Sequence, residues 1–152
     1  MSDSKRAFTM IELIFVIVIL GILAATAIPK LSATRDDATV SKAAHIIATA
    51  STEIQAYAAA TGSVDDDLSV MSNMVGASVS HGNAVLDVPN SLVEFKMGSQ
   101  QDCITLNVIT TVNDINLSLT FAPSSDTLCK SLQGMFDTSN NLMPLKGEYV
   151  NR

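Results

Sequence analysis

A single carboxylate, Glu12, stands inside the longest apolar run of the sequence, which extends from Phe8 to Ile28. A carboxylate near the interior of a bilayer costs at least about 2.5 to 3.5 kcal/mol on insertion scales, so Glu12 needs a partner of opposite charge. Cleavage between Ala7 and Phe8 would supply that partner, because it creates an α-amino group of pKa about 8, largely cationic at neutral pH. The chemistry predicted here is therefore processing followed by ion pairing.

We expect this amine to pair with Glu12 between chains rather than within one chain. Phe8 and Glu12 stand at i, i+4 spacing, but a free amine at a helix N-terminus faces the positive end of the helix dipole, which makes the intrachain pair poor. A pair between neighbouring chains neutralises both groups and fixes the axial register of one helix against the next. Glu12 is thus predicted to be an assembly residue whose partner is another copy of this chain.

The apolar run around Glu12 is long enough to cross a membrane. All but four of the 21 residues from Phe8 to Ile28 are apolar, and as an α-helix the run would measure roughly 31 Å, close to the hydrocarbon thickness of about 30 Å. Lys5 and Arg6 precede it, and positive charge at that position holds the N-terminal end in the cytoplasm. The C-terminal part of the chain is therefore predicted to be exported.

Two residues weaken this helix locally. Gly21 lowers helix stability by up to about 1 kcal/mol relative to Ala, and Pro29 removes a backbone donor at a cost of about 3 kcal/mol. We expect the stretch between them to be able to bend or melt, while close packing between helices explains Gly21 equally well.

Beyond Pro29, apolar residues continue to recur at three- and four-residue steps as far as Tyr57, and Gly62 is a natural stop. The sequence predicts one helix from Phe8 to about Thr61, roughly 80 Å long, with an amphipathic second half over residues 30–61. This organisation divides the chain into a leader (1–7), a transmembrane and assembly helix (8–29), the amphipathic half (30–61) and an exported globular β-domain (62–152).

The exported part changes from helical to strand periodicity. Ser63 to Gly82 is polar and is interpreted as a connecting loop, with Asp65 to Asp67 as a solvated acidic stretch rather than a calcium site. The spacing of Leu68, Met71, Met74 and Val75 indicates one helical turn within it. From Ala84 onward apolar and polar residues alternate, which predicts half-buried antiparallel strands covered on their apolar face by the helix. The strands are expected at 93–97, 104–108 and 115–121, with a turn at Asn113 and Asp114, and a short helix is expected around Cys129. The predicted fold class is α+β.

Composition limits the function classes. The chain has 152 residues, a formal charge of −6 and only 16% charged residues, against about 25% in ordinary soluble domains, which disfavours direct nucleic-acid binding and favours a membrane environment. His45 and His81 have no Cys or carboxylate at ligand spacing, and neither phosphate loops nor nucleophile motifs occur. We therefore expect no enzyme activity, no cofactor and no metal site.

The two cysteines, Cys103 and Cys129, both lie in the predicted exported part. An oxidising compartment permits the one pairing available to them, and a bond enclosing residues 104–128 is worth about 3 to 4 kcal/mol in the chain-entropy model. A disulfide is expected.

Residues 6–31, RAFTMIELIFVIVILGILAATAIPKL, resemble the N-terminal signature of type IV pilins and type II secretion pseudopilins. The resemblance implies that a prepilin peptidase cuts after Ala7 and methylates the amine of Phe8, and that Glu12 contacts the terminal amine of a neighbouring subunit, with Thr9 in the same motif. It also implies that the segment from Gly21 to Pro29 lengthens when subunits leave the bilayer. The family usually has Gly where this chain has Ala7, which predicts slower processing at most.

This resemblance predicts a structural subunit of a type IV pilus-like filament, a homo-oligomer that is a single-pass inner-membrane protein before assembly and a periplasmic or surface filament afterwards. Its expected partners are the prepilin peptidase, the inner-membrane assembly machinery and the inner membrane itself. One alternative is a pseudopilin of a type II secretion or DNA-uptake system. Such proteins often use calcium in place of the disulfide, for which Asp126, Asp137 and Asn140 are the candidates, so the cysteines favour a pilin weakly. Another is a soluble secreted binding domain, released by signal peptidase after Ala27.

Overall fold

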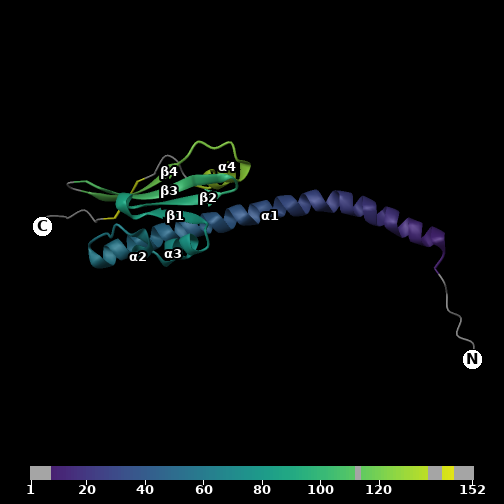
Figure 1. Ribbon diagram of the computed structural model, residues 1–152, viewed down its shortest axis with the longest axis horizontal. Coiled ribbons are helices and arrows are strands. Elements are labelled where there is room, and N and C mark those ends of the chain that lie inside the picture. The colour runs from purple at the N-terminus through teal and green to yellow at the C-terminus, as the bar shows by residue number, and fades with distance from the viewer. Residues whose placement is uncertain (1–7, 112–113, 137–141, 146–152) are drawn as a thin grey trace, which may run out of the picture. The chain divides into compact units, whose positions relative to one another are not determined.

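The computed structural model describes residues 8–111, 114–136 and 142–145 of the chain. Its longest element is helix α1, Met10–Thr61, drawn from purple to blue in Figure 1. The chain divides into two compact units, one ending at Ala38 and the other beginning at Thr39. Helix α1 contributes to both units, which are described in turn.

In the first unit, every described residue from Phe8 to Ala38 is exposed. An 18-residue window of α1 has a mean hydropathy of 2.8, with none of it buried in the protein. By length and composition this helix is apolar enough to cross a membrane. The backbone is α-helical through both Gly21 and Pro29, so the weakened stretch is a regular part of the helix in this structure.

The second unit contains a five-stranded antiparallel sheet whose spatial order follows the chain order. The strands are β1 (Ala84–Asp87), β2 (Leu92–Met97), β3 (Gln100–Thr110), β4 (Ile115–Phe121) and β5 (Leu142–Pro144). Buried residues alternate along β2, as its period-two sequence pattern predicted. The predicted turn at Asn113 and Asp114 is described only at Asp114, because Asn113 lies outside the described residues.

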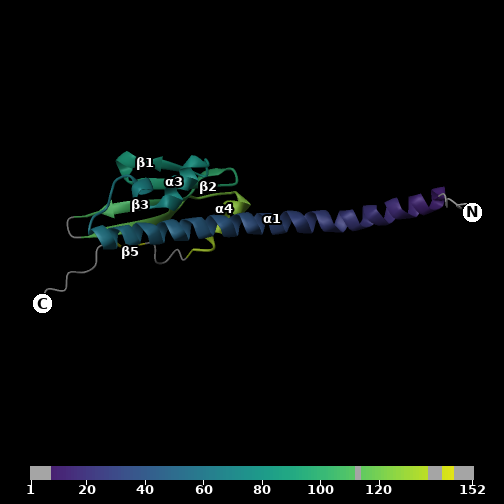
Figure 2. The ribbon, with the colours of Figure 1, turned by 90° about the horizontal axis from the view of Figure 1, so that it is seen from below.

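The core of this unit lies between the apolar face of the sheet and the part of α1 that follows Ala38. Fully buried Ile47 and Ile54 of α1 belong to one cluster with Val93, Leu106 and Leu117 of the sheet. In Figure 2, β5 appears next to the same part of α1, and there the Gln55 amide donates to the Met143 sulfur at 3.0 Å. The predicted α+β fold, a long helix packed on a small antiparallel sheet, is confirmed.

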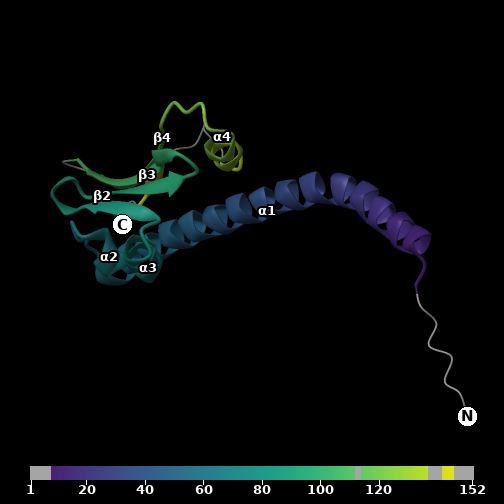
Figure 3. The same cartoon turned by 45° about the vertical axis from the view of Figure 1, so that its right-hand side comes forward.

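The prediction of a connecting loop from Ser63 to Gly82 is wrong, although the predicted helical turn falls on two short helices. This segment contains α2 (Leu68–Met71) and α3 (Asn73–Ser80), which lie beside the C-terminal part of α1 in Figure 3. Leu68, Met71 and Val75 are buried in the core.

Polar side chains cap both of these short helices. The carboxylate of Asp67 accepts a hydrogen bond from the backbone of Ser69 at the start of α2, and the hydroxyl of Ser72 accepts one from Val75 at the start of α3. The acidic residues therefore make specific contacts in addition to facing solvent, because Asp66 also accepts a hydrogen bond from Ser91 at 3.1 Å. Asp67 and Ser72, polar residues that suggested a loop, instead cap these helices.

Two further elements complete the unit. Helix α4, Thr127–Gln133, carries Cys129 as the sequence predicted. Strand β5 was not predicted, since its three residues are too few to show a period. It pairs with β4 and is followed by Leu145, which is buried.

Candidate assembly site at the helix N-terminus

The first turn of α1 is closed by Thr9 and Glu12. The backbone N–H and the hydroxyl of Thr9 both donate to Oε2 of Glu12, at 2.8 and 2.6 Å, and the Glu12 N–H points back to the Thr9 hydroxyl at 3.4 Å. Thr9 is thus the N-cap of the helix and Glu12 its third residue, the reciprocal arrangement called a capping box. The Thr-x-x-Glu spacing in the sequence is the signal for this box, a role that the family resemblance alone did not indicate.

This geometry divides the two oxygens of the Glu12 carboxylate between different roles. Oε2 accepts both hydrogen bonds from Thr9, whereas Oε1 accepts none from the residues that the structure describes. Charge-assisted hydrogen bonds offset part of the cost of holding a carboxylate in an apolar environment. The arrangement can therefore stabilise the ionised side chain while leaving one oxygen available to a cationic donor.

The surroundings of the capping box are apolar and uncovered. Phe8, Met10 and Ile11 are 82%, 80% and 63% exposed, so the carboxylate is surrounded by side chains that need a bilayer or neighbouring helices to cover them. The predicted cleavage site is only partly visible, because Ala7 lies outside the described residues.

The structure does not bring Gly21 and Pro29 to the Glu12 site. Gly21 lies beyond the first two turns of α1, and a Cβ added to it would meet nothing within 4 Å. Pro29 lies inside the helix, and its missing N–H leaves one helical hydrogen bond unmade. Both residues are exposed, so their roles depend on what surrounds the helix.

A second group of functional candidates lies in the sheet unit. Cys103 of β3 and Cys129 of α4 form a disulfide with their Cα atoms 5.7 Å apart, and both residues are fully buried. The side-chain amide of Gln133 reinforces this junction by donating to the carbonyls of Cys103 and Ala122, each at 2.8 Å. The expected bond is present and ties α4 to the start of β3.

Asp126 connects the same helix to the turn between β2 and β3. Its carboxylate accepts hydrogen bonds from the backbone and hydroxyl of Ser99, at 3.0 and 2.9 Å, and from the backbone of Leu128 and Cys129. These bonds, the one from the Ser99 backbone foremost, lower the pKa of Asp126 to about 2. Gly98 has φ +60°, and a Cβ there would lie 2.7 Å from the carboxyl carbon of Asp126, so this close approach requires glycine.

These bonds bear on the calcium alternative. The Asp126 carboxylate is used for capping α4 and for holding the turn at Ser99, while the other candidates, Asp137 and Asn140, lie outside the described residues. Within the described part of the chain, no group of three or more His, Cys, Asp or Glu is placed to hold a metal ion.

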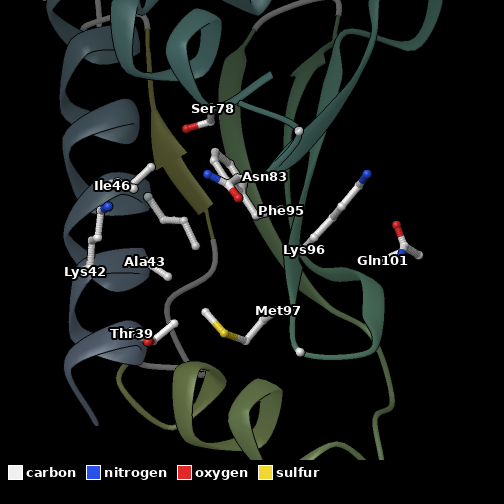
Figure 4. A pocket seen from close by; sticks show the side chains of 13 residues that line it. Thr39, Lys42, Ala43, Ile46, Ser78, Asn83, Phe95, Lys96, Met97 and Gln101 are labelled. Atoms are coloured by element: carbon white, nitrogen blue, oxygen red, sulfur yellow. The ribbon is translucent and has the colours of Figure 1, made fainter. Parts of the chain in front are cut away.

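A groove of about 370 Å³ lies between α1 and β2 in the sheet unit (Figure 4). Ile46 of α1 and Phe95 and Met97 of β2 form its apolar surface, and Lys42 and Asn83 contribute polar groups. The described residues that line it include no Asp, Glu, His or Cys. The groove therefore offers no carboxylate, imidazole or thiol for general acid–base chemistry.

The two histidines lie apart from the groove lining. Nδ1 of His81 lies 2.6 Å from the carbonyl of Ala77 at the C-terminal end of α3, and His45 is exposed on α1.

A long helix with an uncovered apolar part and a capped carboxylate in its first turn, together with an antiparallel sheet tied to α4 by a disulfide, gives a pilin-like α+β fold. Residues 3–28 match the family model described as the prokaryotic N-terminal methylation motif, so the chain carries the signature of type IV pilins and pseudopilins. Comparisons with curated proteins and with solved structures found no match. The motif is that of a structural protein family and in general implies processing by a prepilin peptidase, membrane anchoring and assembly into filaments.

Proposed function

We propose that this chain is the structural subunit of a type IV pilus-like filament. A prepilin peptidase cuts after Ala7 and methylates the new amine of Phe8, and the mature chains polymerise through the helix over residues 8–29. Residues 62–152 form the exported domain on the outside of the filament. The observation that supports this proposal most directly is the Glu12 carboxylate, held by Thr9 through one oxygen on an otherwise apolar and exposed helix.

The capping box explains how one residue can serve in two environments. In the bilayer, the N–H and hydroxyl of Thr9 stabilise the ionised Glu12 through Oε2, which reduces the cost of insertion. In the filament, Oε1 accepts a hydrogen bond from the Phe8 amine of a neighbouring copy. Both charges are then paired in an environment without water. Any other axial register of the two helices would leave the amine and the carboxylate without partners.

The proposed topology places residues 1–7 in the cytoplasm and the sheet unit on the opposite side of the inner membrane. Lys5 and Arg6 support this orientation through the bias of positive charge toward the cytoplasm. The Cys103–Cys129 disulfide suits the oxidising compartment beyond the membrane. The inner-membrane assembly machinery is the partner that moves the helix from lipid into the filament, whose final position is periplasmic or at the cell surface.

N-terminal mass spectrometry of filaments purified from the native host tests the proposal. A first residue of methylated Phe8 is expected, whereas a chain beginning at Ile28 would indicate a soluble domain released by signal peptidase. Because the methylation motif is shared with pseudopilins, deletion of the gene distinguishes the two roles. Loss of surface fibres or motility supports a pilus, and loss of protein secretion or DNA uptake with surface fibres intact supports a pseudopilus.

A further inference from the structure

Lys30 is the first charged residue that follows the apolar run of α1, and it is exposed. The hydroxyl of Thr34 donates to its backbone carbonyl at 3.0 Å, but its ammonium group has no hydrogen bond or ion pair with the residues that the structure describes. No carboxylate stands three or four residues from it in the sequence, which is the spacing required for a salt bridge within one helix. The Lys30 charge therefore has no partner available in its own helix.

Asp36 and Asp37 present the complementary situation. Both are exposed on α1, and their carboxylates accept no hydrogen bond from the described part of the chain. No Lys or Arg stands three or four residues from either one. Six residues separate Lys30 from Asp36, about 9 Å along a helix axis, so Lys30 and Asp36 of one helix are too far apart to pair.

A neighbouring copy can bring these charges together. If the Phe8 amine of one copy meets Glu12 of the next, the second helix is displaced toward its N-terminal end by up to four residues, about 6 Å. The same displacement reduces the axial separation between Lys30 of the first copy and Asp36 of the second from about 9 Å to as little as about 3 Å. The long stem of lysine spans such a distance.

We propose that Lys30 forms an ion pair with Asp36 or Asp37 of the adjacent copy in the filament. This inference rests on the proposed function and adds a second contact between the same two helices, just beyond the end of the apolar run. In the membrane, Lys30 lies at the level of the lipid phosphates, which provide its counter-ion. When the helix leaves the bilayer those phosphates are lost, and the carboxylates of the next copy replace them.

Charge exchange between these positions tests the proposal in cells that contain the assembly machinery. Lys30→Glu, and separately Asp36→Lys with Asp37→Lys, should each lower the yield of sheared filaments about tenfold or more, because attraction between adjacent copies becomes repulsion. The triple variant that combines these substitutions restores the pairing with its signs reversed and should recover most of the wild-type yield. Lys130→Glu on α4, an exposed lysine outside the helix interface, is the matched control and should leave the yield unchanged.

The level of processed subunit in the membrane, measured in cells without the assembly machinery, separates assembly from insertion. Equal membrane levels with reduced filament yield, followed by recovery in the triple variant, support the ion pair. Wild-type filament yield from both charge-reversed variants, or a triple variant no better than either, overturns the ion pair while leaving the filament proposal intact. Failure of the processed wild-type chain to form filaments would instead overturn the proposed function itself.

Discussion

Glu12 accepts two hydrogen bonds from a single residue, Thr9, through one carboxylate oxygen: the N–H at 2.8 Å and the hydroxyl at 2.6 Å. The acid therefore stabilises the start of α1 by capping it and at the same time presents its other oxygen outward. In the proposed filament, one carboxylate would serve both as a helix cap and as an assembly contact. Substitutions at the two positions can separate these contributions.

Replacement of Glu12 by Ala removes both contributions and should abolish filament formation while leaving membrane insertion unchanged or improved. Loss of the carboxylate removes an insertion cost of at least about 2.5 kcal/mol, but it leaves the amine of the neighbouring copy without a counter-ion. Immunoblots of membrane and sheared-filament fractions measure the two effects separately. Glu12→Asp is a useful companion, because it keeps the charge but shortens the side chain. Abundant filaments from Glu12→Ala would contradict the pairing.

Thr9→Val tests the cap without removing the acid. The valine keeps the backbone N–H that donates to Glu12 but lacks the hydroxyl, so the helix start should lose about 1 kcal/mol and the carboxylate should be less well held. We expect a several-fold lower filament yield rather than complete loss, with Thr9→Ser close to wild type because it retains the hydroxyl. Filament yield normalised to membrane-bound subunit is the measurement. An equal yield from Val and Ser would show that the hydroxyl has no role.

The extent to which sequence patterns predict this structure depends on how local the determining interactions are. The long helix and strands β2, β3 and β4 follow from periodicity, because each covers enough residues for a period to be recognised. Helices α2 and α3 are short, and the start of α3 is held by Glu53, whose carboxylate accepts hydrogen bonds from Ser72 and Met74. A contact across 19 residues leaves no local pattern.

The candidate assembly site is the opposite case. Its capping box is local, and the Thr-x-x-Glu spacing contains the necessary information. What the sequence does not contain is the arrangement of copies, which decides whether the Phe8 amine of one chain reaches Glu12 of the next as proposed. Strand β5 has three residues and is likewise determined by its partners, β4 and the Gln55 side chain of α1.

Glu53→Ala should destabilise the sheet unit by about 1 to 2 kcal/mol, because it removes a charged acceptor from the Ser72 hydroxyl and the Met74 N–H and leaves the start of α3 unsatisfied. Denaturant unfolding of the full-length chain in detergent measures the change. Glu94→Ala on the outward face of β2 is the control, since no described residue hydrogen-bonds its carboxylate, and it should have a small effect. A midpoint for Glu53→Ala that equals that of the control would contradict a capping role.

Asp126 gives the sheet unit a dependence on pH whose sign follows from its environment. Hydrogen bonds from Ser99 and from the start of α4 lower its pKa from 3.8 to about 2 in the folded chain. A depressed carboxylate pKa contributes stability that is fully present above pH 3.8 and is lost as the pH falls through about 2. Asp126→Asn removes the titrating group, so its melting temperature should be lower than that of the wild type at pH 5 to 7.

The difference between Asp126→Asn and the wild type should shrink between pH 4 and pH 2, where protonation of Asp126 in the wild type removes the same charge. Thermal unfolding of the full-length, disulfide-bonded chain in detergent at several pH values measures this convergence. Asp114→Asn is the matched control, because the Asp114 side chain accepts no hydrogen bond from the described residues, and its curve should follow the wild type throughout. A constant difference between Asp126→Asn and wild type over the whole pH range would mean that the ionised carboxylate does not hold α4 to the β2–β3 turn.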